Sequence, residues 1–136
     1  MRKNYTLLVA ILFIYCSYTY HFNITGNIKD FNSSVEYIAI IRQTNGFKIK
    51  DIPITTDSSG LFKIDFTLVN GIPKTLHIFE NDLVFANANF RFDKKEKKGY
   101  IIIPTTGQKE YFQQKKDEKN DLIYFVEKIE FRKESY

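Results

Sequence analysis

Apolar and polar residues alternate in short runs along most of the chain, as expected for β-strands with one buried face. The clearest run covers residues 61–69, where Phe62, Ile64, Phe66 and Leu68 alternate with charged or polar side chains. Similar runs predict strands in seven further segments: residues 20–29, 35–43, 47–54, 75–79, 83–92, 100–105 and 122–132.

Glycines and turn residues give the pattern its local detail. Gly26 lies inside the first predicted strand, which indicates a bulge or a close neighbour. Asp57-Ser58-Ser59-Gly60 reads as a turn in which Asp57 accepts backbone N–H groups and Gly60 adopts a positive φ. We expect Phe62 to re-enter the core directly after this turn.

Two runs predict further core faces. In residues 83–92 the predicted inward face is Val84, Ala86, Ala88, Phe90 and Phe92. In residues 122–132 it is Ile123, Phe125, Ile129 and Phe131.

Residues 108–120 are the only segment with a helical composition, rich in Lys, Glu and Gln, and a short helix or a mobile loop fits them equally well. The regular spacing of strands and turns predicts an all-β fold, a single antiparallel β-sandwich of seven to eight strands, with a small barrel as the related alternative. We expect residues 20–136 to form this one domain.

The first residues have the layout of a secretory signal, and we expect residues 1–19 to be a signal peptide. Arg2 and Lys3 precede an unbroken apolar run over residues 7–14, which is followed by small residues. The run is shorter than the roughly 20 residues that span a bilayer. We therefore expect export to the periplasm, the outer membrane or the cell surface.

Cys16, the only cysteine, follows the apolar run at the place where bacterial lipoproteins are cleaved and acylated. Phe13 is tolerable three residues before it, but Tyr15, directly before it, is bulky and departs from the lipobox pattern. Lipidation with membrane attachment through Cys16, ordinary cleavage near Cys16, Ser17 or Thr19, and an uncleaved anchor remain open. With no other cysteine, the exported part has no disulfide.

Two short motifs resemble a known family. Ile24-Thr25-Gly26-Asn27-Ile28 and the later Thr55-Thr56-Asp57-Ser58-Ser59-Gly60-Leu61-Phe62 are similar to the opening strand and the turn-strand motif of carboxypeptidase-regulatory-like (transthyretin-like) β-sandwich domains of bacterial envelope proteins. The resemblance implies a sandwich fold, an envelope location and a role without catalysis. It supplies no active-site residues.

Composition excludes several classes of function. Apolar residues make up 43% and aromatic residues 16% of the 136 residues, which is enough for a packed core. The net charge is +4, and the basic residues do not form the dense one-sided stripe of a nucleic-acid-binding surface. His21 and His77 are the only histidines, and no nucleophile elbow, zinc-protease motif or phosphate-binding loop occurs. We expect no enzymatic activity, metal, cofactor or nucleic-acid partner.

Two features are candidate partner contacts. Lys94, Lys95, Lys97 and Lys98 form the densest charge on the chain. They suit an acidic protein partner, anionic lipid or polysaccharide, or else keep a hairpin solvated. Tyr111 and Phe112, in a polar stretch, either anchor it to the core or contact a partner.

Two functional hypotheses follow. The first is an exported, non-catalytic binding or structural module at the bacterial cell envelope. The second is a carrier for a small apolar ligand, in which the sheets close around a barrel-like cavity.

Overall fold

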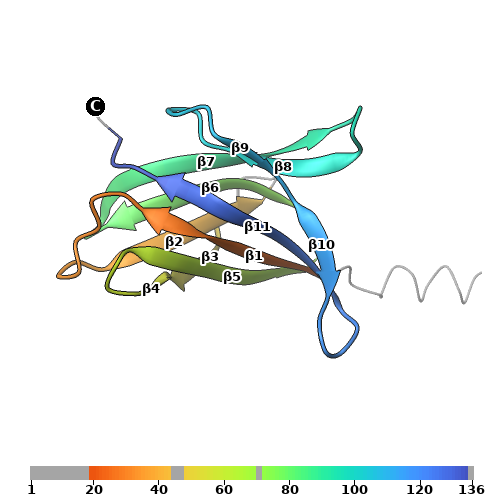
Figure 1. Cartoon of the computed structure of the whole chain (residues 1–136), viewed down its shortest axis with the longest axis horizontal. Coiled ribbons are helices and arrows are strands. Elements are labelled where there is room, and N and C mark those ends of the chain that lie inside the picture. Colours follow the sequence, from red (N-terminus) through yellow and green to blue (C-terminus); the bar gives the residue numbers. More distant parts are fainter. Residues whose placement is uncertain (1–18, 44–47, 70–71, 135–136) are drawn as a thin grey trace, which may run out of the picture.

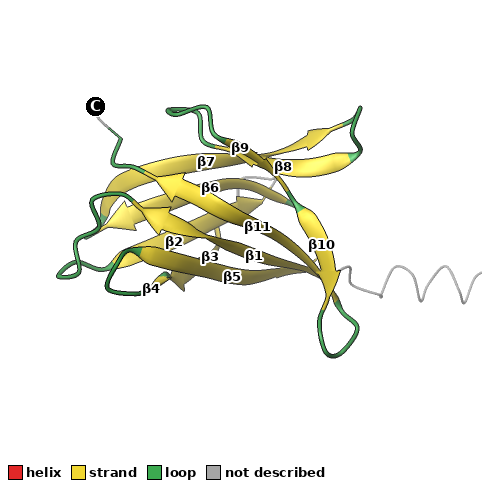
Figure 2. Cartoon of the chain, viewed as in Figure 1, coloured by secondary structure: helices red, strands yellow, loops and turns green. Residues whose placement is uncertain are grey.

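The computed structural model describes residues 19–43, 48–69 and 72–134, and these residues form strands and turns with no helix (Figures 1 and 2). The strands are β1 (Thr19–Ile28), β2 (Tyr37–Gln43), β3 (Lys48–Pro53), β4 (Thr55–Thr56), β5 (Leu61–Val69), β6 (Pro73–Glu80), β7 (Leu83–Asp93), β8 (Lys98–Ile102), β9 (Lys109–Tyr111), β10 (Gln113–Lys116) and β11 (Leu122–Phe131). The predicted signal peptide and Cys16 lie outside the described residues, apart from Thr19.

The strands form two sheets that pack face to face, which confirms the predicted all-β sandwich. One sheet has the order β10-β11-β1-β5-β4 and the other β3-β2-β6-β7-β8-β9 (Figure 1). The core between them consists mainly of Ile, Leu and Phe side chains, with Ile24, Ile64 and Phe131 among the most deeply buried. Strand β5 matches its prediction fully, because Phe62, Ile64, Phe66 and Leu68 are buried and their neighbours are exposed.

One strand pair departs from the predicted antiparallel arrangement. β1 pairs antiparallel with β5 on one side but parallel with β11 on the other. A parallel pair requires a crossover connection. Here the chain makes that crossover through the second sheet and returns by β10, which runs antiparallel to β11.

At two of the points where the chain passes from one sheet to the other, a single buried residue separates the two strands, and each of these changes closes one side of the sandwich. β3 belongs to one sheet and β4 to the other, with Ile54 between them. β9 and β10 also belong to different sheets, and Phe112, whose exposed fraction is 8%, lies between them. Strands that switch sheets at such corners give a sandwich a barrel-like closure.

The short helix expected as one alternative for residues 108–120 is wrong, because this segment forms β9, β10 and a turn. The other alternative, a loop, describes only the turn after β10. All side chains of β10 are exposed, so its polar composition reflects a solvated strand rather than a helix. Asp117 closes the turn by accepting the N–H groups of Lys119 and Asp121, with Asn120 at a φ of 68°.

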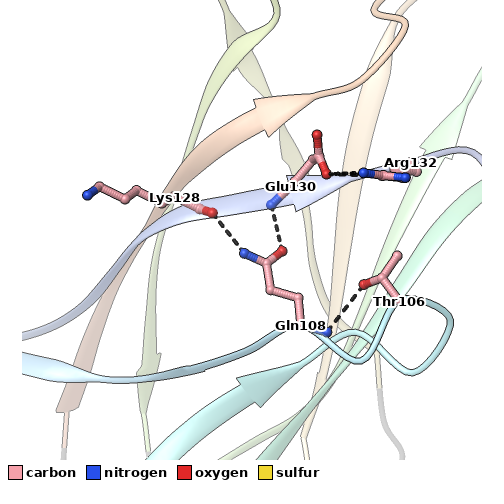
Figure 3. A network of polar contacts seen from close by, with 5 residues as sticks. All are labelled: Thr106, Gln108, Lys128, Glu130 and Arg132. Carbon is pink, nitrogen blue, oxygen red and sulfur yellow. Dashed lines mark hydrogen bonds and ion pairs between the residues drawn. The ribbon is translucent and has the colours of Figure 1, made fainter.

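Gln108 completes the edge of β11 beyond β10. Its side-chain amide donates to the Lys128 carbonyl at 2.9 Å and accepts the Glu130 N–H at 2.9 Å (Figure 3). These are the two bonds that a neighbouring strand would otherwise supply. The amide therefore links the loop before β9 to the opposite sheet.

Two β-bulges change which side chains reach the core. The β6–β7 register shifts between Ile78 and Phe79, so Phe85 is buried whereas Val84 is 38% exposed, contrary to the prediction for Val84. The predicted positions Ala86, Ala88 and Phe90 are buried as expected.

The second bulge lies in β11, where the register with β1 shifts between Ile24 and Gly26 and Lys128 has a φ of 65°. Before the bulge the core face is Tyr124 and Val126, and after it Ile129 and Phe131. Ile123 and Phe125 were therefore assigned to the wrong face, while Ile129 and Phe131 were assigned correctly.

Candidate functional site: an aromatic cleft at one end of the sandwich

A cleft of about 650 Å³ opens at the end of the sandwich where β1, β6 and β8 begin and β5 and β7 end. This volume is within the range of about 300–1,000 Å³ that is usual for small-molecule sites. Both sheets contribute to its lining. The aromatic lining residues are Tyr20, Phe22, Phe90, Phe92, Phe112 and Tyr124.

The floor of the cleft is a cluster of aromatic rings in contact. The Phe22 ring centroid lies 5.5 Å from that of Phe112 and 5.6 Å from that of Tyr124. The Phe112 ring stacks on Phe90, with centroids 5.9 Å apart. Aromatic pairs at these distances stabilise one another beyond their burial. The floor is thus a preformed apolar surface fixed by both sheets.

Phe92 extends this surface to the mouth of the cleft. Strand alternation places it on the same inner face as buried Phe90, yet its exposed fraction is 64%. The sequence therefore predicted the correct face for Phe92 but wrongly predicted that it is buried. The core ends before strand β7 ends. Ile72 is also an exposed apolar residue of the lining.

Gly99 leaves room in the cleft wall. Gly99, on β8, pairs with Phe92 on β7. A Cβ atom placed on Gly99 would meet its nearest neighbours, Arg91 O and Phe112 Cδ2, at 3.7 Å. That is ordinary van der Waals contact, and Gly99 is not among the glycines with positive φ. A side chain at this position would therefore occupy the cleft without straining the backbone.

The charged residues that line the cleft, among those the structure describes, are all cationic: Lys74, Arg91, Lys97 and Lys98. Lys74 is an exposed lining residue at the start of β6, where the register with β2 shifts between Arg42 and Gln43. Lys97 is in the turn between β7 and β8, whereas Arg91 and Lys98 alternate to the outer face. Lys74 and Lys97 are thus the cations best placed to reach a bound ligand.

The predicted lysine cluster lies in the β7–β8 hairpin, and its members differ in their position relative to the cleft. Lys97 and Lys98 belong to the cleft lining, whereas Lys94 and Lys95 are exposed in the turn outside it. Asp93 holds the turn by accepting the N–H groups of Lys95 and Glu96 at 2.9 and 3.1 Å. Part of the cluster therefore supports a site that sequence reasoning did not detect.

Tyr111 and Phe112 point in different directions. Phe112 is buried at the cleft floor, whereas Tyr111 lies beside the ring of Tyr100 and donates its hydroxyl hydrogen to Asp93 Oδ2 at 2.8 Å. This hydrogen bond from Tyr111 lowers the pKa of Asp93, with bonds from the turn N–H groups and the charge of Lys109 contributing. Both residues anchor β9 and β10 to the sandwich.

Two polar clusters lie away from the cleft. The first contains His21 on β1 and its neighbours Asp65 and Thr67 on β5. His21 Nε2 lies 2.9 Å from Asp65 Oδ1, and His21 Nδ1 lies 3.3 Å from Thr67 Oγ1. These are the residue types of a hydrolase triad, but such a site also needs free donors for an oxyanion. His21 is on β1, which is paired on both sides, so we interpret the trio as a cross-strand ladder on the outer face.

The second cluster joins His77, Asn87 and Glu134. Asn87 Oδ1 and His77 Nδ1 form a hydrogen bond, and the Glu134 carboxylate accepts the backbone and side-chain N–H groups of Asn87. Glu134 N–H in turn donates to the Phe85 carbonyl. This cluster secures the end of the described chain against β7 and satisfies His77.

Across residues 19–43, 48–69 and 72–134, no three His, Cys, Asp or Glu residues are grouped so as to hold a metal ion. Nor does any helix in those segments meet the length and hydropathy needed to span a membrane.

Comparison of the chain with protein-family models, curated proteins and solved structures finds no significant match. The resemblance to transthyretin-like domains therefore stays a prediction. The local physics expected of its motifs is confirmed. Asp57 Oδ1 accepts the N–H groups of Ser59 and Leu61 at 2.9 and 3.0 Å, Gly60 has a φ of 88°, and Gly26 lies at a bulge.

Proposed function

We propose that the domain is a non-catalytic binding protein that holds a small apolar ligand in the aromatic cleft. The observation that carries this proposal is an aromatic floor built from both sheets beneath a cleft of about 650 Å³. Sites for small molecules are characteristically concave and apolar with a few polar groups at their margin. Of the two hypotheses from the sequence, this favours the carrier.

Export to the cell envelope remains part of the proposal. It is supported by the order of charged, apolar and small residues in the first 19 positions. Intact mass, measured on soluble and membrane fractions of a Gram-negative host, tests it. A form beginning at Cys16 with added acyl mass would identify a lipoprotein, an unmodified shorter form would identify simple secretion, and full-length protein would contradict cleavage.

The first hypothesis, a module that binds an envelope protein or polysaccharide, keeps one specific support. Lys94 and Lys95 are exposed in the β7–β8 turn outside the cleft, where they are accessible to an acidic macromolecule. Replacing both with Gln would weaken such a contact and leave ligand binding in the cleft unchanged. Small-ligand and macromolecular binding are therefore separable.

Binding of an uncharged fluorescent probe such as N-phenyl-1-naphthylamine to the native protein tests the main proposal. We expect enhanced probe fluorescence that is weakened in Gly99→Val, because the added isopropyl group would narrow the cleft from a position that tolerates a Cβ. Gly99→Ala, with the smaller side chain, should reduce binding less. No enhancement, or equal enhancement in wild type and Gly99→Val, would overturn the cleft as the site.

A further inference from the structure

We propose that the cleft selects ligands with an anionic head on the apolar body, specifically long-chain carboxylates. This inference rests on the proposed function and adds the chemical class of the ligand. Its basis is the contrast between the apolar floor and the mouth of the cleft. Among the described residues of the lining, every charged side chain is a cation and none is an acid.

The position of Lys74 suits a head group at the mouth. Thr75 pairs with Asn89, and Lys74, which precedes Thr75 on β6, lines the cleft together with Phe90 of β7. Lys74 is itself exposed while its neighbour Leu76 is fully buried. A ligand whose apolar body covers Phe90 and Phe92 would therefore bring its end within reach of this ammonium group.

Lys97 supplies a second charge on the other side of Phe90 and Phe92. Sheet order places β7 between β6 and β8, so Phe92 lies between Lys74 and the β7–β8 turn that carries Lys97. Gln114, which pairs with Tyr124, adds a polar group from the opposite sheet. This arrangement, with a cation on each side of Phe92, suits a ligand that has one anionic head on an apolar chain.

Within the part of the chain that the structure describes, these charges have no counter-ion. Among residues 19–43, 48–69 and 72–134, neither Lys74 nor Lys97 forms an ion pair or a side-chain hydrogen bond. The nearby carboxylate of Asp93 is directed to Tyr111 and to its own turn. Charge-assisted hydrogen bonds to a carboxylate are stronger than hydrogen bonds between neutral groups. A ligand with a carboxylate head should therefore bind more tightly than a neutral ligand with the same apolar body.

Matched ligands and matched variants test the inference. Dodecanoate and dodecanol share an apolar chain and differ in head charge, and each is titrated below its aggregation concentration against the full folded chain. We expect dodecanoate to bind about tenfold more tightly, and Lys74→Gln with Lys97→Gln to abolish that difference while leaving the affinity for dodecanol unchanged. Lys63→Gln with Lys94→Gln removes two exposed cations outside the lining and serves as the charge-matched control.

The outcomes separate this inference from the proposed function. Equal affinities for dodecanoate and dodecanol would overturn the head-group selectivity and leave the apolar site intact. Binding of neither would overturn both. Co-sedimentation with anionic phosphatidylglycerol vesicles, without binding of free dodecanoate, would replace the inference by attraction to a membrane surface. Equal loss of dodecanoate affinity in the control pair would show a long-range charge effect and also contradict it.

Discussion

The backbone of Ile129 occupies the space that a side chain at Gly26 would need. A Cβ atom on Gly26 would lie 1.8 Å from the Ile129 carbonyl oxygen and within 2.7 Å of two further backbone atoms of that residue. The contact occurs at the bulge where the β1–β11 register shifts. Glycine is therefore required here by the close approach of two parallel strands.

Gly26→Ala should destabilise the domain by about 3 kcal/mol or more, because the added methyl group forces paired strands apart. Urea unfolding followed by circular dichroism measures the change. Gly99→Ala is the matched control, since its Cβ would meet its neighbours at 3.7 Å. Equal unfolding midpoints for the two variants would contradict the proposed role of the close approach.

The amide of Gln108 should contribute about 1 kcal/mol through its two bonds to β11. Gln108→Ala removes both bonds. Gln108→Glu keeps an acceptor for the Glu130 N–H but places a carboxylate against the Lys128 carbonyl, so it should not restore stability at neutral pH. Thermal unfolding at pH 7 compares them, and full stability in Gln108→Glu would show that the donated bond is unimportant.

The turn at Asp57 predicts a specific dependence on pH. The hydrogen bond from the Ser59 hydroxyl, followed by bonds from backbone N–H groups of the turn, holds the pKa of the Asp57 carboxyl below its ordinary value. Because the pKa is lower in the folded than in the unfolded state, the stabilisation is present above the unfolded value of about 4. It is lost as pH falls through the folded pKa.

Ser59→Ala should therefore raise the pKa of Asp57 toward its ordinary value, as measured by NMR titration of its carboxyl carbon. Ser58→Ala is the matched control, since the hydroxyl bonded to Asp57 belongs to Ser59. Identical titration curves for the two variants would contradict the assigned cause.

Several features of the fold were accessible from the sequence because they depend on local chemistry. Alternation located β5 and its buried face, and the Asp57 turn and the bulge at Gly26 followed from residue type. The face assignments for Val84, Ile123 and Phe125 failed because a bulge elsewhere in the pairing reverses the alternation. The helical interpretation of residues 108–120 failed because β10 is fully exposed, so its polar composition carries no strand periodicity.

The cleft could not be predicted, because its residues lie far apart in the sequence and converge only through sheet order. Tyr20, Phe92 and Phe112 come from a first strand, a hairpin and a corner between the sheets. A local signal existed: Phe92 continues an apolar face directly before the lysine hairpin. Recognising it as the mouth of a site required knowing that the core ends at Phe90.

Phe92 should matter for ligand binding far more than for stability. Its exposed fraction is 64%, so Phe92→Ala should change the free energy of unfolding by less than about 0.5 kcal/mol. The loss of an aromatic contact should weaken probe binding about tenfold. Leu83→Ala, at the other end of β7 with an exposed fraction of 74%, should alter neither property. Equal effects of the two substitutions on fluorescence titrations would contradict a site at the cleft.

The most direct test of the account is an NMR titration of the backbone amides with the uncharged probe. A ligand in the cleft should shift the amides of Tyr20, Gly99 and Phe112, which line it, and leave the Gly60 turn at the opposite end of the sandwich unchanged. Saturable shifts confined to the cleft are the predicted result. Shifts that gather around the Gly60 turn, or no shifts at all, would contradict the aromatic cleft as a binding site.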